Sequence, residues 1–443
     1  MTATQEEHAV SLTHYSGLAA AVSMSILMTA CGSQMPNHSA RFQPVFPGTA
    51  GRPVLSAQEA ERFTPQHYFA HGGEYARPVT DGWTPTPIET AHVAAAYVVG
   101  PRVGVAGVTH TSIQQAVNAA LRQHPGQTRV YIKLLPGTYT GTVYIPEGAP
   151  PLTLFGAGDQ PEQVVVSLAL DSMMSPADYR ARVNPHGQYQ PTDPAWYMYD
   201  VCASKPGTTI NTTCSAVMWS QSNDFQLKNL TVVNALLDTA DSGTHQAVAL
   251  RTDGDRVQLE NVRLLGRQDT FFVNTSDRQN SYVTDHYSRA YIKDSYIEGD
   301  VDYVFGRATA VFDGVRFHTV SSRGSKEAYV FAPDSIPSVK YGFLVINSRL
   351  TGDSGYRGAQ KAKLGRAWDQ GAKQTGYLPG KTANGQLVIR DSTIDSSYDL
   401  INPWGSAATT DRPFKGNINP QRHLDDLHFN RLWEYNTQVL LRE

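Results

Sequence analysis

Two segments, FQLKNLTVV (225–233) and VQLENVRLL (257–265), share the pattern that decides the fold. In each, apolar and polar residues alternate up to an asparagine, and a further apolar residue stands three positions after it. The alternation indicates a strand that buries one face, and the asparagine allows a tight bend. Each segment therefore predicts two short strands that meet at a bend and share one interior.

The pattern occurs six times between residues 225 and 394, with bends 20 to 44 residues apart. The bend residues are Asn229, Asn261, Asp294, Gly314, Asn347 and Asp391. The residues two positions before the bends are Leu227, Leu259, Ile292, Phe312, Val345 and Ile389. The positions four before and three after each bend are apolar as well. Coils of about 20 residues with insertions of variable length are typical of a β-solenoid.

We therefore predict an all-β fold, a single-stranded solenoid of the right-handed parallel β-helix type, with the handedness taken from known solenoids. A propeller would keep a more regular period, and a β-sandwich would not need the same bend residue in every unit. Residues 109–123 have apolar residues at helical spacing behind Thr111 or Ser112 as a cap, which predicts a short helix over the N-terminal end. Residues 171–212 predict a long loop insertion, and the residues from Leu400 onward predict loops and, within 422–436, a short C-terminal helix.

The bulk composition excludes several classes of partner. The chain has 443 residues, a formal net charge of -3 and 17% charged residues, so it lacks the basic excess of a nucleic-acid-binding protein. No H-E-x-x-H motif or paired Cys/His spacing indicates a metal site. We expect a monomer without a metal or cofactor.

The N-terminal region predicts export. Residues 17–30 form an apolar stretch, and the tetrad 28–31, which ends in Cys31, resembles a bacterial lipobox. Residues 1–30 would then be a lipoprotein signal peptide, and Cys31 would carry the lipid that anchors the chain to a membrane. Gly32, rather than an aspartate, follows the cysteine, and by resemblance to enterobacterial lipoproteins this favours the outer membrane. An ordinary apolar tail with a chance cysteine is the alternative.

Three further regions follow the expected signal. Residues 31–57 are rich in proline, glycine and serine and predict a flexible tether. Residues 58–103 predict an N-terminal extension that packs over the end of the domain, and 104–443 the β-helix domain itself. Cys202 and Cys214 could form a disulfide in an oxidising compartment, with two buried free thiols as the alternative.

Four motifs carry polar groups suited to catalysis: HQAVALR (245–251), GRQDTFF (266–272), GDVDYVFG (299–306) and LGRAWD (364–369). They contribute Gln246, Gln268, Asp269, Asp302, Arg366 and Trp368. The two glutamines are 22 residues apart, about one coil, and the two aspartates are 33 apart, one coil plus the polar insertion 274–289. Because neighbouring coils stack about 4.8 Å apart, we expect these groups to converge on one outer face.

This set of groups suits acyl transfer from an ester. Two nearby carboxylates can divide the work when their surroundings separate their pKa values: one beside Arg366 stays ionised and nucleophilic, and the other holds a proton and acts as an acid. Two amide NH₂ groups can donate to the oxyanion of a tetrahedral intermediate. No G-x-S-x-G elbow offers a serine nucleophile. We therefore predict a covalent acyl-aspartate.

In order and in their first spacing, the four motifs resemble the signatures of the pectin methylesterase (pectinesterase) family, over roughly residues 104–405. The lipobox, the insertion and the segment YVFAPDS (329–335) resemble the bacterial outer-membrane lipoprotein branch of that family. The resemblance implies a right-handed parallel β-helix that needs no cofactor and removes methyl esters from pectin or methylated oligogalacturonides. Since the insertion could narrow the cleft, short oligogalacturonides are the expected preference.

The resemblance also implies roles for individual residues. Asp302 would be the nucleophile and Asp269 the general acid, then base. Gln268 would line the oxyanion hole, and Gln246 would assist it and bind substrate. Arg366 would pair with Asp302 and contact substrate. The remaining substrate contacts would come from Trp368, Tyr303 and Ser215. Two departures, Gly141 for a family glutamate and Ala367 for a family proline, remove no catalytic group.

Other functions remain as alternatives. An acyl-CoA thioesterase-like subgroup of the same branch resembles a degenerate form of this site, in which the second glutamine motif and the aspartate motif have drifted; both are intact here. A non-catalytic polysaccharide-binding solenoid would lose the carboxylate pair. A polygalacturonase would need a Gly-His-Gly that this sequence lacks.

Overall fold

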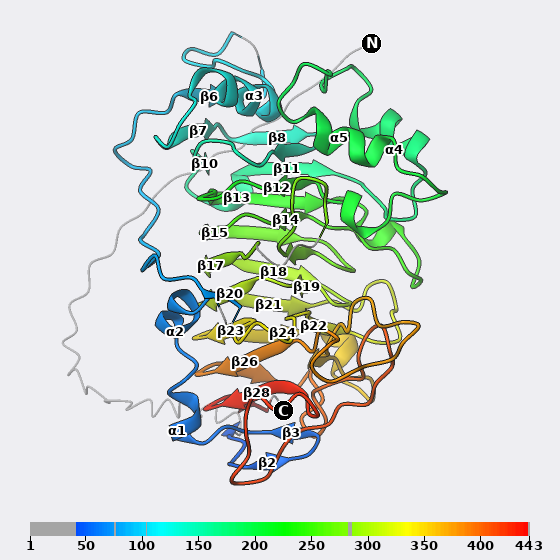
Figure 1. The fold of residues 1–443 in the computed structure, drawn as a ribbon. Coiled ribbons are helices and arrows are strands. Elements are labelled where there is room, and N and C mark those ends of the chain that lie inside the picture. The colour runs from blue at the N-terminus through cyan, green and yellow to red at the C-terminus, as the bar shows by residue number, and fades with distance from the viewer. Residues whose placement is uncertain (1–40, 75–76, 103, 282–285, 442–443) are drawn as a thin grey trace, which may run out of the picture. The chain divides into compact units, whose positions relative to one another are not determined.

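The computed structural model describes residues 41–74, 77–102, 104–281 and 286–441, whose strands stack into a parallel β-helix (Figure 1). The larger sheet contains β1 (Arg41–Phe42), β6 (Tyr97–Val99), β7 (Val130–Leu134), β8 (Gly137–Thr140), β10 (Leu152–Gly156), β11 (Val164–Leu168), β13 (Gln226–Asn234), β15 (Val257–Leu265), β17 (Arg289–Lys293), β18 (Tyr296–Gly299), β20 (Thr309–Asp313), β21 (Arg316–Thr319), β23 (Phe343–Ile346), β24 (Arg349–Gly352), β26 (Gln386–Arg390), β27 (Thr393–Asp395), β28 (Arg431–Tyr435) and β29 (Gln438–Leu440). The smaller sheet contains β9 (Val143–Ile145), β12 (Met218–Ser220), β14 (Leu250–Thr252), β16 (Phe271–Val273), β19 (Val304–Gly306), β22 (Tyr329–Pro333) and β25 (Lys363–Gly365).

One coil shows how the sheets are connected. β17 and β18 belong to the larger sheet and meet at Asp294, β19 belongs to the smaller sheet, and β20 then stacks on β17 as the next coil begins. All six predicted bend residues have a left-handed backbone, with φ between 47° and 68°. Asparagine, aspartate and glycine adopt this conformation at the least cost. The bend prediction is therefore confirmed.

The predicted alignment of the coils is also the observed strand register. Residues two positions before the bends pair in sequence, Leu227 with Leu259, then Ile292, Phe312, Val345 and Ile389. Each is buried in the solenoid interior. Burial of a side chain of this size stabilises the fold by about 1.5–3 kcal/mol. A shift of register by one residue would expose all of these stacked side chains, so the register is strongly determined.

A short helix covers the N-terminal end, as predicted. Helix α3 (Ile113–Gln123) begins after Ser112, whose side chain accepts a hydrogen bond from the backbone N–H of Gln115. Its buried residues include Ile113, Ala116 and Val117, which join the solenoid core.

The structure of the residues before 104 contradicts three predictions. Residues 41–57 are not a flexible tether: β1 pairs with β29, and the buried Arg52 donates to Glu434 at 2.8 and 2.9 Å. Residues 58–74 and 77–88 do not pack over the domain end but run along the outer face of the larger sheet (Figure 1), where Phe69 contacts Tyr291 and the backbone N–H of Ile88 donates to Glu260. The apolar outer face of the larger sheet needs a cover, and these aromatic residues supply it. The sheet also starts before residue 104, because β6 pairs with β7.

The C-terminal segment is a further coil, not a helix. β28 pairs with β26 and β29 with β27, and Asn436 forms another left-handed bend with φ 48°. The sequence hides this repeat because Glu434 stands where the other coils have an apolar residue. Its carboxylate is buried against Arg52 and accepts from Thr437 at 2.7 Å, which offsets the desolvation of the charge.

The insertion after β11 covers one end of the smaller sheet. It contains α4 (Pro176–Val183) and α5 (Trp196–Ala203), and its Tyr189 stacks on Tyr144 of β9 at 5.3 Å. Cys202 and Cys214 form a disulfide, so the alternative of two free thiols is excluded.

The remaining elements are short. They are α1 (Ala57–Ala60), α2 (Pro65–Ala70), the hairpins β2 (Gly48–Thr49) with β3 (Arg52–Pro53) and β4 (Gly73–Glu74) with β5 (Arg77–Pro78), and the 3-10 turns Pro161–Gln163, Thr212–Cys214, Leu237–Thr239 and Ser354–Tyr356. Within the described ranges, no helix has the length and apolar character needed to cross a membrane. The predicted signal peptide and Cys31 lie outside the described residues.

Candidate active site

The residues of the four motifs meet along one edge of the smaller sheet. Gln246 and Gln268 form a parallel bridge between neighbouring coils, just before β14 and β16. Asp269 follows Gln268, and its backbone N–H donates to the carbonyl of Val301, the residue before Asp302. Arg366, directly after β25, reaches back to Asp302. The predicted convergence of these groups is therefore present.

Asp302 and Arg366 form a bidentate ion pair. The Nε of Arg366 donates to Oδ1 at 2.9 Å and an Nη to Oδ2 at 2.7 Å, and both side chains are largely buried, at 12% and 15% exposure. The guanidinium lies over the ring of Tyr329 at 4.0 Å. Burial lowers the pKa of Arg366, but the charge and hydrogen bonds of Asp302 and the charges of Tyr329 and Glu327 together outweigh it, and the net shift is upward. Asp302 thus accepts two charge-assisted hydrogen bonds from one guanidinium.

Asp269 has the opposite environment. It is buried, and no described residue donates a hydrogen bond to its carboxyl group. Burial first, and then the negative charge of Asp302, raise the pKa of Asp269 well above its usual range, although Arg366 lowers it in part. Its backbone is left-handed, with φ 67°, a conformation that aspartate tolerates. The two carboxyl groups therefore have different surroundings: Asp302 lies against a guanidinium, and Asp269 is buried with a raised pKa.

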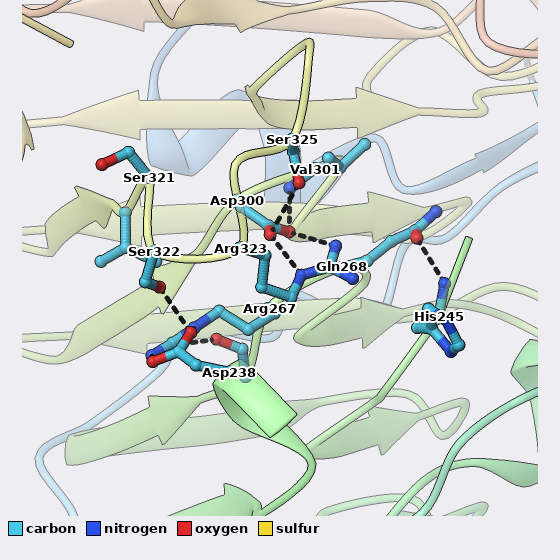
Figure 2. A network of polar contacts seen from close by, with 12 residues as sticks. Asp238, His245, Arg267, Gln268, Asp300, Val301, Ser321, Ser322, Arg323 and Ser325 are labelled. Atoms are coloured by element: carbon cyan, nitrogen blue, oxygen red, sulfur yellow. Dashed lines mark hydrogen bonds and ion pairs between the residues drawn. The ribbon is translucent and has the colours of Figure 1, made fainter. Parts of the chain in front are cut away.

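The side-chain amides of Gln246 and Gln268 are both held through their oxygens, which leaves their NH₂ groups as donors for a substrate. The Oε1 of Gln268 accepts from the backbone N–H of His245 at 3.0 Å (Figure 2), and the Oε1 of Gln246 accepts from the hydroxyl of Ser172 at 2.6 Å. Within the described part of the chain, no acceptor takes a hydrogen bond from either Nε2 group. Both amides can therefore donate to an oxyanion.

A charged network supports the loop that carries Asp302 (Figure 2). Arg323 donates to both oxygens of Asp300 at 2.7 and 3.2 Å, and Asp300 accepts from the backbone N–H of Val301 at 2.7 Å. Arg323 also donates to the carbonyl of Asp241 at 2.9 Å, in the loop before Gln246. The turn with the carboxylate and the loop with the amide are thus fixed to one buried guanidinium.

Trp368 extends the site with an aromatic surface. Its ring meets Phe305 edge-on at 5.6 Å and Phe272 at 6.1 Å, and these two rings stack on each other at 4.2 Å. The tryptophan is only partly buried, so it retains surface on which a sugar ring can stack.

Two of the predicted substrate contacts are wrong. Tyr303 is fully buried, and its hydroxyl bonds Thr319 inside the solenoid at 3.0 Å. The left-handed bend at Asp302 sends the aspartate outward and the next residue inward. Ser215 is also fully buried, where it donates to the carbonyl of Thr212 at 2.9 Å and accepts from the N–H of Val248. Neither side chain can touch a saccharide in this conformation.

Several supporting residues are not evident from the sequence motifs alone. Asp300 and His245 lie inside two of the four motifs, and Tyr329 begins the segment YVFAPDS, so the sequence offered a signal for each. For Arg323 and Ser172 no motif indicated a role, because each acts through a contact with a distant part of the chain.

Several known proteins are similar to this chain in sequence and fold. A family model described as Pectinesterase matches residues 201–375. Pectinesterase B of Dickeya dadantii is 92% identical over 98% of this chain and 100% of its own. The Escherichia coli protein YbhC, named a putative acyl-CoA thioester hydrolase, is 47% identical over 96% of both chains; its crystal structure gives a TM-score of 0.82 and covers 90% of this chain and 98% of that chain. The rice weevil pectin methyl esterase structure is 38% identical, with a TM-score of 0.78, and covers 90% of this chain and 99% of its own. This chain belongs to the pectinesterase family.

Proposed function

We propose that this protein is a carboxylic ester hydrolase that removes methyl esters from pectin or methylated oligogalacturonides and releases methanol. The observation that carries the proposal is Asp302, paired with Arg366, beside the buried Asp269. The 92% identity to a Pectinesterase B supports the same substrate class.

The first half of the reaction forms an acyl-enzyme. A carboxylate oxygen of Asp302 attacks the ester carbonyl carbon, and the resulting oxyanion accepts hydrogen bonds from the Nε2 groups of Gln268 and Gln246. The raised pKa of Asp269 keeps a proton available, and Asp269 gives it to the departing methoxy oxygen as methanol leaves. The product is a mixed anhydride between Asp302 and the galacturonate carboxyl group.

The second half restores the enzyme. Asp269, now a carboxylate, takes a proton from a water molecule as that water attacks the anhydride at the galacturonate carbonyl carbon. The bond to Asp302 breaks, and Arg366 stabilises the carboxylate that departs. Asp269 again holds a proton, the new galacturonic acid group gives its remaining proton to solvent and leaves as a carboxylate, and Trp368 supplies the surface on which a neighbouring sugar stacks.

Methanol release from methylated oligogalacturonides tests the proposal. Wild type should release methanol, and Asp302→Asn should reduce the rate by at least about a thousandfold, because an amide is not a nucleophile. Hydrolysis of an acyl-CoA thioester by the folded wild type, without methanol release, would instead support the activity named for the 47% identical relative.

We further propose that the protein is a monomer anchored to a bacterial outer membrane by a lipid on Cys31. The lipobox-like tetrad that ends at this cysteine supports the proposal. Membrane fractionation of wild type against Cys31→Ala tests it: wild type should sediment with the outer membrane and the variant should be soluble. Equal distribution of the two would refute the anchor.

A further inference from the structure

The long insertion is held at its base by its own contacts. Asn211 N–H donates to the carbonyl of Ser172, and Ile210 N–H donates to that of Met174, both at 2.9 Å. The disulfide between α5 and Cys214 closes the exit side. The entry residues of the insertion therefore have a fixed position next to the candidate active site.

Ser172 is bonded to Gln246 at two points. Its hydroxyl donates to Oε1 at 2.6 Å, and its backbone N–H donates to the backbone carbonyl of Gln246 at 2.9 Å. The serine is 1% exposed, so water does not compete for these bonds. The hydroxyl of Ser172 thus occupies Oε1 of Gln246, and among the described residues no acceptor takes a hydrogen bond from its Nε2.

Asp171 is connected to the second amide through one residue. Its Oδ2 lies 2.7 Å from Nδ1 of His245, whose Nε2 lies 3.2 Å from Asp241. The backbone N–H of His245 donates to Oε1 of Gln268 (Figure 2). Because a peptide N–H can only donate, this contact selects the amide orientation that leaves the NH₂ group of Gln268 toward the substrate.

We propose that Asp171 and Ser172 are positioning residues for ester hydrolysis, which hold the amides of Gln268 and Gln246 as oxyanion donors. The inference rests on the proposed function. Donors that are already oriented stabilise the developing charge without reorganising, whereas a released glutamine side chain samples other rotamers. Asp171 and Ser172, the first two residues of the insertion, thus support the catalytic groups although they lie outside the four motifs.

A double-mutant cycle tests this role. Ser172→Ala should lower kcat roughly three- to tenfold, the effect of removing one hydrogen bond, with KM within about twofold of wild type. In a Gln246→Ala background the same change should have no further effect, because the serine acts through that amide. Asp171→Ala should likewise have no further effect in a Gln268→Ala background.

Ser175→Ala is the matched control. Ser175 caps α4 in the same insertion through the N–H of Asp178 and does not contact either glutamine. It should loosen the insertion while leaving kcat unchanged. An undiminished effect of Ser172→Ala in the Gln246→Ala background, or an unchanged kcat in Ser172→Ala alone, would overturn the inference while the esterase assignment stands. Absence of methanol release by folded wild type would overturn both.

Discussion

Replacing Arg366 by lysine tests the ion pair on which the proposed nucleophile depends. Lysine keeps the positive charge, but one ammonium group cannot reproduce the bonds at 2.9 and 2.7 Å to both oxygens of Asp302. It also removes the planar stacking over Tyr329 at 4.0 Å. The variant therefore separates the geometry of the pair from its charge.

The expected magnitude follows from the one hydrogen bond to Asp302 that lysine cannot make. A charge-assisted hydrogen bond contributes about 1.5–3 kcal/mol. If the whole contribution is used in the transition state, kcat/KM for methanol release should fall roughly 10- to 150-fold. Arg366→Met removes the charge as well and leaves Asp302 buried and unpaired, which destabilises the fold by about 3–5 kcal/mol.

The chain contains a close control for this experiment. Arg412 binds both oxygens of Asp369 at 3.0 and 2.8 Å and stacks on Tyr377 at 3.8 Å, but it makes no contact with the reacting groups. Arg412→Lys should lower the melting temperature about as much as Arg366→Lys, while kcat/KM stays within about twofold of wild type. Wild-type kcat/KM in Arg366→Lys, or an equal fall in Arg412→Lys, would refute the role given to the pair.

Three further predictions concern stability, binding and the insertion. Because burial and Asp302 raise the pKa of Asp269, the native state retains a proton that the unfolded state releases, and wild type becomes less stable as pH rises through that pKa. Asp269→Asn lacks this dependence, so its melting temperature relative to wild type should increase from about pH 4 to pH 8. A difference in melting temperature that stays constant with pH would contradict the prediction. Trp368→Ala should raise KM for oligogalacturonides roughly five- to thirtyfold with kcat nearly unchanged, because about 1–2 kcal/mol of stacking is removed; an unchanged KM would place the sugar elsewhere. Serine in place of Cys202 and Cys214 together should leave the coils folded but make the segment 171–214 sensitive to limited proteolysis; equal cleavage of wild type would show that the disulfide does not hold the insertion.

The coil register could be read from the sequence because it depends on local chemistry. A left-handed bend restricts the residue to asparagine, aspartate or glycine, and a buried column requires apolar residues at fixed offsets from it. Both constraints act within about nine residues of chain. This is why the sequence correctly predicts the pairing of Leu227 with Leu259 and the equivalent pairs in the following coils.

The convergence of the motifs was predictable for a related reason. Once one coil stacks on the next, residues one coil apart must be neighbours, so the bridge between Gln246 and Gln268 follows from their spacing. The partner of Asp302 was expected only from the resemblance to a family. The separation of Asp302 and Arg366 in sequence does not indicate that they are neighbours unless the number of coils between them is known.

What the sequence determined, then, was the solenoid, its bends, its register and the edge where the polar groups gather, since each depends on short-range patterns repeated along the chain. The tertiary structure decided the rest. It placed Tyr303 inside and Asp302 outside through one backbone bend, buried Glu434 against a distant Arg52, and brought Ser172 to Gln246. These contacts join residues far apart in sequence, and only the three-dimensional packing of the chain determines which distant groups satisfy one another's hydrogen bonds and charges.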